Sequence, residues 1–382
     1  MDRRSSNHSR SSPPTISDSR AAGRAPAASA APNWAAAAAP LRAWLTLPAW
    51  LILAAVLLFS YVFPTLAVCW QFWPFVLGMI FLGLPHGALD HLAPLFILHK
   101  RLTPRYLVLF VLGYAALVVV YLVFWHLFPL AALAVFLLCS WLHWGQGDAY
   151  FLRVFERQPA PRSGGGRFLI WAVRGGLPIL LPPLAHPQAF SQVAGGILSW
   201  YGSRADWVLT AAQRDAGLVV LALAIAAYLW QSWRLSKSAF WRDAGEVALL
   251  GVYFLVVPAI LAVGVYFCVW HSARHIARLM LLDDADRRLL ALRRIGQCVL
   301  RSAVQALPMT LGALGFLAGL FWWQGRSHVN IGSFVFLYLS LIAALTFPHF
   351  LLVLWMDREE FGQDSSNSVV IGGRRDSLSD SL

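Results

Sequence analysis

Ten runs of apolar residues, most of them long enough to cross a lipid bilayer, constrain the fold of this chain more than any other feature. A helix needs about 20 mostly apolar residues to span the hydrocarbon core, because each residue advances it by about 1.5 Å. The chain is 59% hydrophobic and only 13% charged, too little charge for the surface of a water-soluble domain. We therefore predict an all-α, polytopic transmembrane helix bundle. The runs lie near residues 44–63, 71–95, 106–127, 130–149, 168–185, 216–233, 246–261, 262–281, 302–323 and 333–356.

The stretch 246–281 decides the number of spans, because it is short for two spans and long for one. Pro258 and Gly264 are candidates for a break within it. If the basic N-terminal tail lies in the cytoplasm, ten spans also place the large basic clusters there, as the positive-inside rule requires. A single span over 246–281 would put the arginine-rich run 287–301 outside. We favour about ten spans within a range of eight to ten, with both termini cytoplasmic.

Polar, low-complexity stretches flank the apolar part at both ends. Residues 1–42 are rich in Ser, Ala, Pro and Arg, and residues 359–382 are mostly polar, so we predict two disordered tails. Residues 43–358 remain as one helical, catalytic membrane domain. No signal peptide is expected, because about forty polar or small residues precede the first apolar run. The net charge of +12 lies in connections and tails, where it sets topology, and predicts no nucleic-acid binding.

Histidines within four of the apolar runs indicate a metal centre inside the bilayer. Ionisable side chains are costly in hydrocarbon, so several in one bundle suggest function. Imidazole is also a common metal ligand. In the ten-span topology these histidines share one depth, in the cytoplasmic halves of their helices, so distant segments can meet there. The motifs are Pro85-His86-Gly87-Ala88-Leu89-Asp90-His91, Trp141-Leu142-His143-Trp144-Gly145, His271-Ser272-Ala273-Arg274-His275 and Pro348-His349.

The spacing and neighbours of these residues suggest individual roles. His271 and His275 are four residues apart, so on a helix they share a face and can bind one ion together. His86 stands between a proline and a glycine, an irregular backbone tolerated at membrane depth where it lines a cavity. We assign it to the metal. We expect Asp90 to hold an imidazole in one tautomer, although it could instead complete a two-histidine-one-carboxylate site.

The remaining polar groups leave alternatives open. His143, between two tryptophans, is a further predicted ligand. His349 would either line a substrate pocket or join the metal, and His91 is a ligand or a neighbour. Cys139 and Cys268 lie about one turn from histidines, so a sulfur ligand remains an alternative. The competing interpretations are an interfacial polar cluster around His271 and an Asp–His pair that only ties helices together.

Taken in order, these motifs resemble the signatures of the Brp/Blh family of integral-membrane β-carotene 15,15′-dioxygenases. The run Gly83-Leu84-Pro85-His86-Gly87-Ala88-Leu89-Asp90-His91 resembles the opening signature, and the likeness extends over residues 70–357. Trp144 stands where a phenylalanine is common. The later motifs are His143-Trp144-Gly145 with Asp148, His271-x-x-Arg274-His275 and Pro348-His349.

The resemblance implies a ferrous, non-haem enzyme that splits all-trans-β-carotene at its central double bond with O₂, giving two retinal molecules. It implies Fe²⁺ ligands at His86, His143, His271 and His275, with Asp90 and His349 as further catalytic candidates. It also implies a multi-pass protein of a bacterial inner membrane with a functional link to an opsin.

Three other functions compete with this prediction. A membrane di-iron desaturase or hydroxylase is disfavoured, because such enzymes carry several dense histidine clusters and this chain has one HxxxH pair. A bis-histidine haem protein would also use membrane histidines. A non-enzymatic retinal or carotenoid carrier, or an opsin-assembly protein, would bind the pigment and leave it intact.

Overall fold

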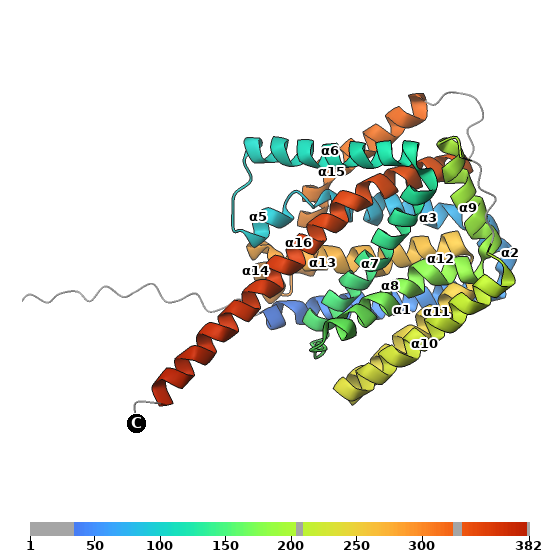
Figure 1. The fold of residues 1–382 in the computed structure, drawn as a ribbon. Helices are drawn as coiled ribbons and strands as arrows, with labels where there is room; N and C mark the ends of the chain where they lie inside the picture. The colour runs from blue at the N-terminus through green and yellow to red at the C-terminus, as the bar shows by residue number, and fades with distance from the viewer. Residues whose placement is uncertain (1–33, 204–208, 324–330, 380–382) are drawn as a thin grey trace, which may run out of the picture. The chain divides into compact units, whose positions relative to one another are not determined.

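The chain folds into a bundle of helices in the computed structural model, which describes residues 34–203, 209–323 and 331–379 (Figure 1). Within these residues there is no strand, so the predicted all-α class is confirmed. Residues 34–382 form one compact unit. Its first helices are α1 (Trp34–Val62), α2 (Pro64–Trp70), α3 (Phe72–Gly78), η1 (Met79–Gly83, a π-helix), α4 (Leu84–Ala88), α5 (Ala93–Ile97), α6 (Pro104–Leu127), α7 (Pro129–Val154) and α8 (Gly164–Ala185).

The second half of the chain continues in the same way. Its helices are α9 (Pro187–Trp200), α10 (Ala211–Leu235), α11 (Lys237–Val256), α12 (Ala259–Tyr266), η2 (Phe267–Ser272, a second π-helix), α13 (Ala273–Leu282), α14 (Asp284–Ala291), α15 (Ile295–Trp323) and α16 (Ile331–Ser379).

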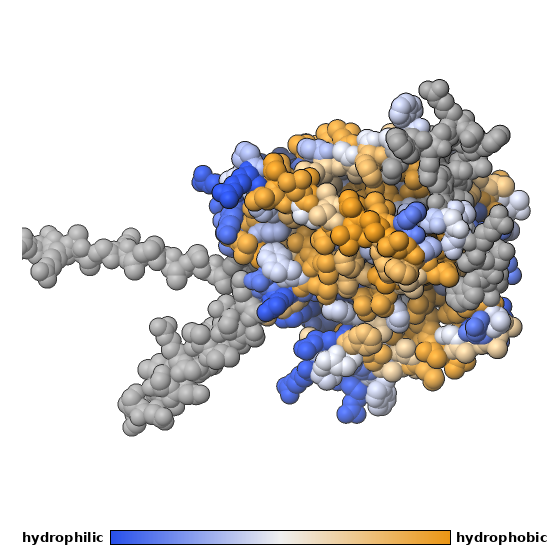
Figure 2. All heavy atoms as spheres, turned by 45° about the horizontal axis from the view of Figure 1, so that its top comes forward, coloured by the Kyte–Doolittle hydropathy of each residue, from blue (hydrophilic) through white to orange (hydrophobic). Residues whose placement is uncertain are grey.

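Eight stretches of the described chain are long and apolar enough to cross a membrane, and the bent pair Pro64–Trp70 and Phe72–Ala88 makes a ninth. The chain is therefore a multi-pass membrane protein, and the predicted range of eight to ten spans is confirmed. Figure 2 shows the broad hydrophobic surface that such a bundle presents on one face. Large apolar side chains stay exposed along α6, among them Val108, Leu112 and Val120, which suits contact with lipid.

Helix α11 accounts for the difference between nine spans and the favoured ten. It is 20 residues long, enough to cross about 30 Å of hydrocarbon, and the chain breaks after it at Pro258. It is not among the apolar stretches counted above because it carries charged residues, including Asp243 and Glu246. Both carboxylates are buried, and Arg174 of α8 pairs with Glu246 and lies 3.7 Å from Oδ1 of Asp243. The charged face of α11 is thus covered by protein.

Helices α7 and α8 approach each other very closely. A Cβ atom on Gly145 would lie 2.1 Å from the carbonyl oxygen of Trp171, and one on Gly175 would lie 1.9 Å from that of Trp141. Trp141 also donates its indole N–H to the carbonyl of Ala172 over 2.9 Å. Small residues allow membrane helices to pack backbone against backbone. The crossing fixes α7, the helix that carries His143.

The ends of the bundle lie close to the expected domain boundaries. The alanine-rich start of α1 is helical from Trp34, and its Ala38 and Leu41 are buried. At the other end Glu360 of α16 pairs with Arg278, so it is part of the packed bundle. Helix α1 thus begins within the predicted disordered tail 1–42, and α16 extends into the predicted tail 359–382, so both boundaries differ from the prediction. Disorder of residues 1–33 stays a prediction.

Candidate metal centre

Five buried histidines from five separate segments meet inside the bundle. His86 comes from α4, His143 from α7, His271 from η2, His275 from α13 and His349 from α16. The ring centroid of His86 lies 5.6 Å from that of His271, 5.7 Å from that of His275 and 5.0 Å from that of His349. The ring of His143 lies 4.7 Å from His271 and 4.6 Å from His349. The structure therefore brings together all four predicted ligands and His349.

Two π-helical turns lie side by side at this level. One of them, η1, leads into the helix of His86, and the other, η2, contains His271. Gly83 allows them to approach, since a Cβ atom there would lie 2.9 Å from the ring of Phe267. A π-helical turn holds one residue more than the regular helix and recurs at functional sites. The pair His271 and His275 thus begins in a widened turn, where a regular helix was expected.

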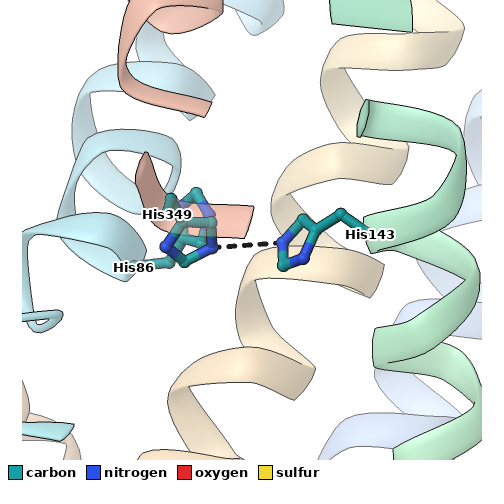
Figure 3. A group of neighbouring side chains, drawn as sticks. All are labelled: His86, His143 and His349. Atoms are coloured by element: carbon teal, nitrogen blue, oxygen red, sulfur yellow. Dashed lines mark hydrogen bonds between the residues drawn. The ribbon is translucent and has the colours of Figure 1, made fainter. Parts of the chain in front are cut away.

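Imidazole nitrogens from neighbouring helices surround Nε2 of His143, and Figure 3 shows three of these rings, those of His86, His143 and His349. Nε2 of His143 lies 3.1 Å from Nε2 of His271 and 3.1 Å from Nε2 of His349. His86, His143 and His349 also offer one ligand atom each within 4.8 Å of one another. A second such group consists of Asp90, His275 and His349, the composition of a two-histidine-one-carboxylate site.

The spacing of these nitrogens fits a bound metal ion. Imidazole nitrogens lie about 2.1 Å from a first-row divalent ion such as zinc, so two ligands are about 3.0 Å apart at a right angle and about 3.4 Å apart at a tetrahedral angle. Both observed 3.1 Å separations fall in that range. A neutral imidazole has one N–H and one lone pair, so three ring tips cannot all satisfy one another by hydrogen bonds. One cation can bind Nε2 of His143 together with that of His349, whereas His271 belongs to neither group whose ligand atoms all lie within 4.8 Å of one another.

Two buried ring nitrogens lack a partner, and one of them supports the same conclusion. Nδ1 of His143 and Nε2 of His275 have no hydrogen-bond partner among the described residues. Leaving a buried polar group unsatisfied costs about 1–3 kcal/mol. A metal ion next to His275 would remove that cost for its Nε2. The donor set therefore fits a divalent transition metal with imidazole and carboxylate ligands.

Asp90 holds the imidazole of His349. Nδ1 of His349 lies 2.8 Å from Oδ2 and 2.9 Å from Oδ1 of the carboxylate, and the hydroxyl of Tyr114 donates to Oδ2 over 3.0 Å. Because α4 ends at Ala88, Asp90 lies in the turn that follows and faces α16. His86 donates its Nδ1 proton to the carbonyl of Gly83. Both imidazoles therefore present Nε2 to the centre.

The other candidate residues lie apart from this cluster. Nδ1 of His91 bonds to the carbonyl of Ala88 over 2.9 Å, and burial lowers the pKa of this imidazole. His186 bonds through Nε2 to the carbonyl of Phe254 over 3.2 Å, and His126 is exposed. Neither metal-capable group contains Cys139 or Cys268, which are buried thiols. His8 and His328 lie outside the described residues.

A network of buried charges stands behind the histidines. Oδ1 of Asp148 accepts the indole N–H of Trp270 over 2.9 Å and a guanidinium N–H of Arg274 over 2.7 Å. These two residues immediately precede His271 and His275. Arg174 and Glu246 extend the network. Glu246 lies at the edge of its predicted run and gives no local signal, whereas Arg174 lies within the run 168–185, where an ionisable residue is a signal that the sequence analysis missed. Asp148 therefore ties α7 to the segment that carries two of the histidines.

A cavity is lined by residues of α7, α8 and α16. Its volume is about 520 Å³, and none of the five histidines lines it. Gln146, one turn after His143, is at its wall and donates to Oδ2 of Asp357 over 2.7 Å. The metal-capable groups are thus buried side chains that do not line this cavity.

Comparisons with known proteins match most of the chain. Residues 77–357 match the family model described as beta-carotene 15,15′-dioxygenase. The chain is 36% identical over 303 residues to the probable beta-carotene 15,15′-dioxygenase Blh of Halobacterium salinarum, covering 77% of this chain and 86% of that protein. It is 27% identical over 305 residues to Brp of the same species, a probable enzyme of the same description, covering 74% and 83%.

A bacterial relative shows the same pattern at greater distance. The beta-carotene 15,15′-dioxygenase of the uncultured marine bacterium 66A03 is 24% identical over 281 residues, covering 72% of this chain and 90% of that protein. No solved structure matches the chain.

Proposed function

This chain belongs to the β-carotene 15,15′-dioxygenase family, and we propose that it cleaves all-trans-β-carotene at the central 15,15′ double bond with O₂, giving two retinal molecules. The observation that carries the proposal is a cluster of buried histidines inside a membrane bundle, in which Nε2 of His143 lies 3.1 Å from Nε2 of both His271 and His349. The named activity of the relatives requires a site that can activate O₂ next to a membrane-dissolved polyene. A buried polyhistidine centre meets both needs.

We assign Fe²⁺ to this centre, with His86, His143, His271 and His275 as its proposed ligands. The iron would supply the electrons and the binding position for O₂. Neutral imidazoles leave the charge of the ion uncancelled. His349 and Asp90 lie next to the same point and are the further residues proposed to act there.

The surrounding side chains keep the centre dry and oriented. The ring of His271 packs against Trp144 at 5.3 Å and against Phe267 at 5.5 Å, measured between centroids. Its position along the helix is fixed by the contacts of Trp270 and Arg274 with Asp148. The polyene need only be held with its central bond beside the metal, so positioning is the main contribution of the protein. In this proposal no side chain has to transfer a proton.

The geometry disfavours one alternative function. A bis-histidine haem site needs the porphyrin plane between two imidazole tips, and Nε2 of His143 is only 3.1 Å from Nε2 of His349. A retinal or carotenoid carrier, or an opsin-assembly role, would not need convergent ring nitrogens at all. We further propose a bacterial inner-membrane location with both termini cytoplasmic, and a link to an opsin that would use the retinal.

Expression in β-carotene-producing bacteria tests the proposal. The wild-type chain should bleach the cells and produce retinal. Both changes are measured by chromatography of the extracted pigments. His271→Ala should leave the pigment intact while the protein still accumulates in the membrane. His126→Ala, which removes an exposed histidine of the same domain, is the matched control and should cleave normally. Yellow cells without retinal, despite folded wild-type protein, would reject the enzymatic function.

A further inference from the structure

We infer that His349 is itself a ligand of the metal, held in its binding tautomer by Asp90 and Tyr114. This inference rests on the proposed function, but it goes beyond the four histidines that the sequence motifs indicate. His349 lies on α16, and 73 residues separate it from His275 in the chain. It is buried, with 5% of its surface exposed.

The positions of the ligand atoms place His349 at the middle of the site. Its Nε2 is as close to Nε2 of His143, at 3.1 Å, as that of His271 is. It belongs to both groups of residues whose ligand atoms lie within 4.8 Å of one another. Whichever of the two groups the ion occupies, His349 is therefore one of its ligands. Figure 3 shows its ring beside that of His86 and facing that of His143.

The hydrogen bonds of His349 prepare it for this role. Its Nδ1 lies 2.8 Å from Oδ2 of Asp90, and a carboxylate can only accept, so the proton is on Nδ1 and the lone pair is on Nε2. Metal-binding histidines usually donate their second N–H to a carboxylate or a carbonyl in this way, which fixes the ring and raises its basicity. Asp90 is 2% exposed, and an acidic residue at this depth needs polar partners, which His349 and Tyr114 supply.

Tyr114 extends the chain of contacts by one step. Its hydroxyl lies 3.0 Å from Oδ2 of Asp90 and 3.2 Å from the carbonyl of Leu345, which is one turn before His349 on α16. The tyrosine thus fixes the carboxylate relative to the helix that carries the proposed ligand. Tyr114 and Asp90 are positioning residues in this scheme, because they act on the metal only through His349.

Cobalt binding by the full-length protein in detergent tests the inference without relying on cleavage. Co²⁺ replaces Fe²⁺ as an air-stable probe whose visible absorption band responds to the number and type of ligands. The metal-stripped wild type is titrated with Co²⁺, and the affinity and the band are compared among His349→Ala, Asp90→Asn, Tyr114→Phe and the control His126→Ala.

We expect His349→Ala to weaken Co²⁺ binding by more than about 100-fold and to shift the band, because a direct ligand matters more than its hydrogen-bond partner. Asp90→Asn should weaken binding by about 10–100-fold, and Tyr114→Phe by less. Imidazole added to the buffer should restore the wild-type band in His349→Ala by entering the space left by the side chain. A residue with only a packing role would show no such rescue.

The outcomes separate this inference from the proposed function. If wild type binds no Co²⁺, the metal centre itself is wrong. If wild type binds but His349→Ala keeps the same affinity and the same band, only the role of His349 is wrong. If His349→Ala does not fold, Asp90→Asn provides the test. Wild-type Co²⁺ affinity in that variant would overturn the inference that Asp90 holds His349 in its metal-binding tautomer.

Discussion

Among single changes near the metal centre, we expect the replacement of Arg174 by methionine to lower the stability of the bundle most. The side chain has no exposed surface and faces three buried carboxylates. It pairs with Glu246, its Nη2 lies 3.7 Å from Oδ1 of Asp243, and its Nε lies 3.6 Å from Oδ2 of Asp148. Methionine keeps much of the volume and removes the charge.

The loss of stability follows from the polar partners that each carboxylate retains. Asp148 retains Arg274 at 2.7 Å, and Asp243 retains the hydroxyl of Ser232 at 2.6 Å. Glu246 loses its close partner and keeps Arg274 only at 3.5 Å. Removing one partner of a buried ion pair costs about 3–5 kcal/mol, because the other charge stays in a low-dielectric interior. At a few degrees per kcal/mol, Tm should fall by on the order of 10 °C.

A thiol-reactive fluorophore can measure this loss in detergent. Cys139, Cys268 and Cys298 are buried and should react only on unfolding, whereas the exposed Cys69 is first replaced by serine. Glu246→Gln in the Arg174→Met background should restore a large part of the lost Tm, since it removes the unpaired charge. If Arg174→Met melts with the wild type, or if the second change lowers Tm further, the ion-pair reasoning is refuted.

Three other changes test separate parts of the structure. Asp148→Asn should weaken Co²⁺ binding by about 10-fold, measured as above, because the carboxylate fixes the residues next to two of the histidines. Gly145→Ala should lower Tm by the equivalent of about 1–3 kcal/mol or more, since its Cβ would meet backbone at 2.1 Å, whereas Gly113→Ala, with nothing within 4 Å, should be neutral or slightly stabilising. Burial raises the pKa of Asp286, on α14 outside the spans, to about 6, so the folded state favours the protonated carboxyl. Its contribution to stability should be complete below about pH 4 and be lost as the pH rises through 6. In Asp286→Asn this part of the pH dependence of Tm should disappear.

The histidine motifs could be recognised from the sequence because the signal is local. An ionisable residue within an apolar run is costly wherever the rest of the chain lies, so His86, His143 and His349 stood out before any fold was known. Counting residues from basic anchors also gave their common depth. Depth alone does not fix the rotation of each helix, so the facing of the rings needed the structure.

The partner of Asp90 could not be derived from local spacing. The carboxylate bonds to His349, which is 259 residues away in the chain, and the helix that would have aligned it with His86 ends at Ala88. The π-helical turn at His271 could not be derived from local spacing either. Its widening depends on the close contact of η1 with η2, which no pattern within either segment predicts.

The candidate spans number fewer than the favoured ten for a related reason. Hydropathy treats Asp243 and Glu246 as charges that belong in water, yet Arg174, which is 72 residues from Glu246, neutralises them inside the bundle. A buried pair hides polar residues from lipid without changing their hydropathy. That α11 crosses the membrane as a tenth span stays a prediction from the charge parity of the loops.

The charge network and the histidines make most sense as one electrostatic unit. Three carboxylates, Asp148, Asp243 and Glu246, face two arginines, Arg174 and Arg274, so the network carries one net negative charge. The carboxylate of Asp90, beside His349, supplies a second negative charge. Imidazoles are neutral ligands, so a divalent ion among them would be uncompensated in hydrocarbon, where charges interact strongly. Two nearby negative charges balance it. The network would then contribute to metal affinity by its charge as well as by its contacts, and neutralising Asp148 should weaken Co²⁺ binding even where the ring positions stay unchanged.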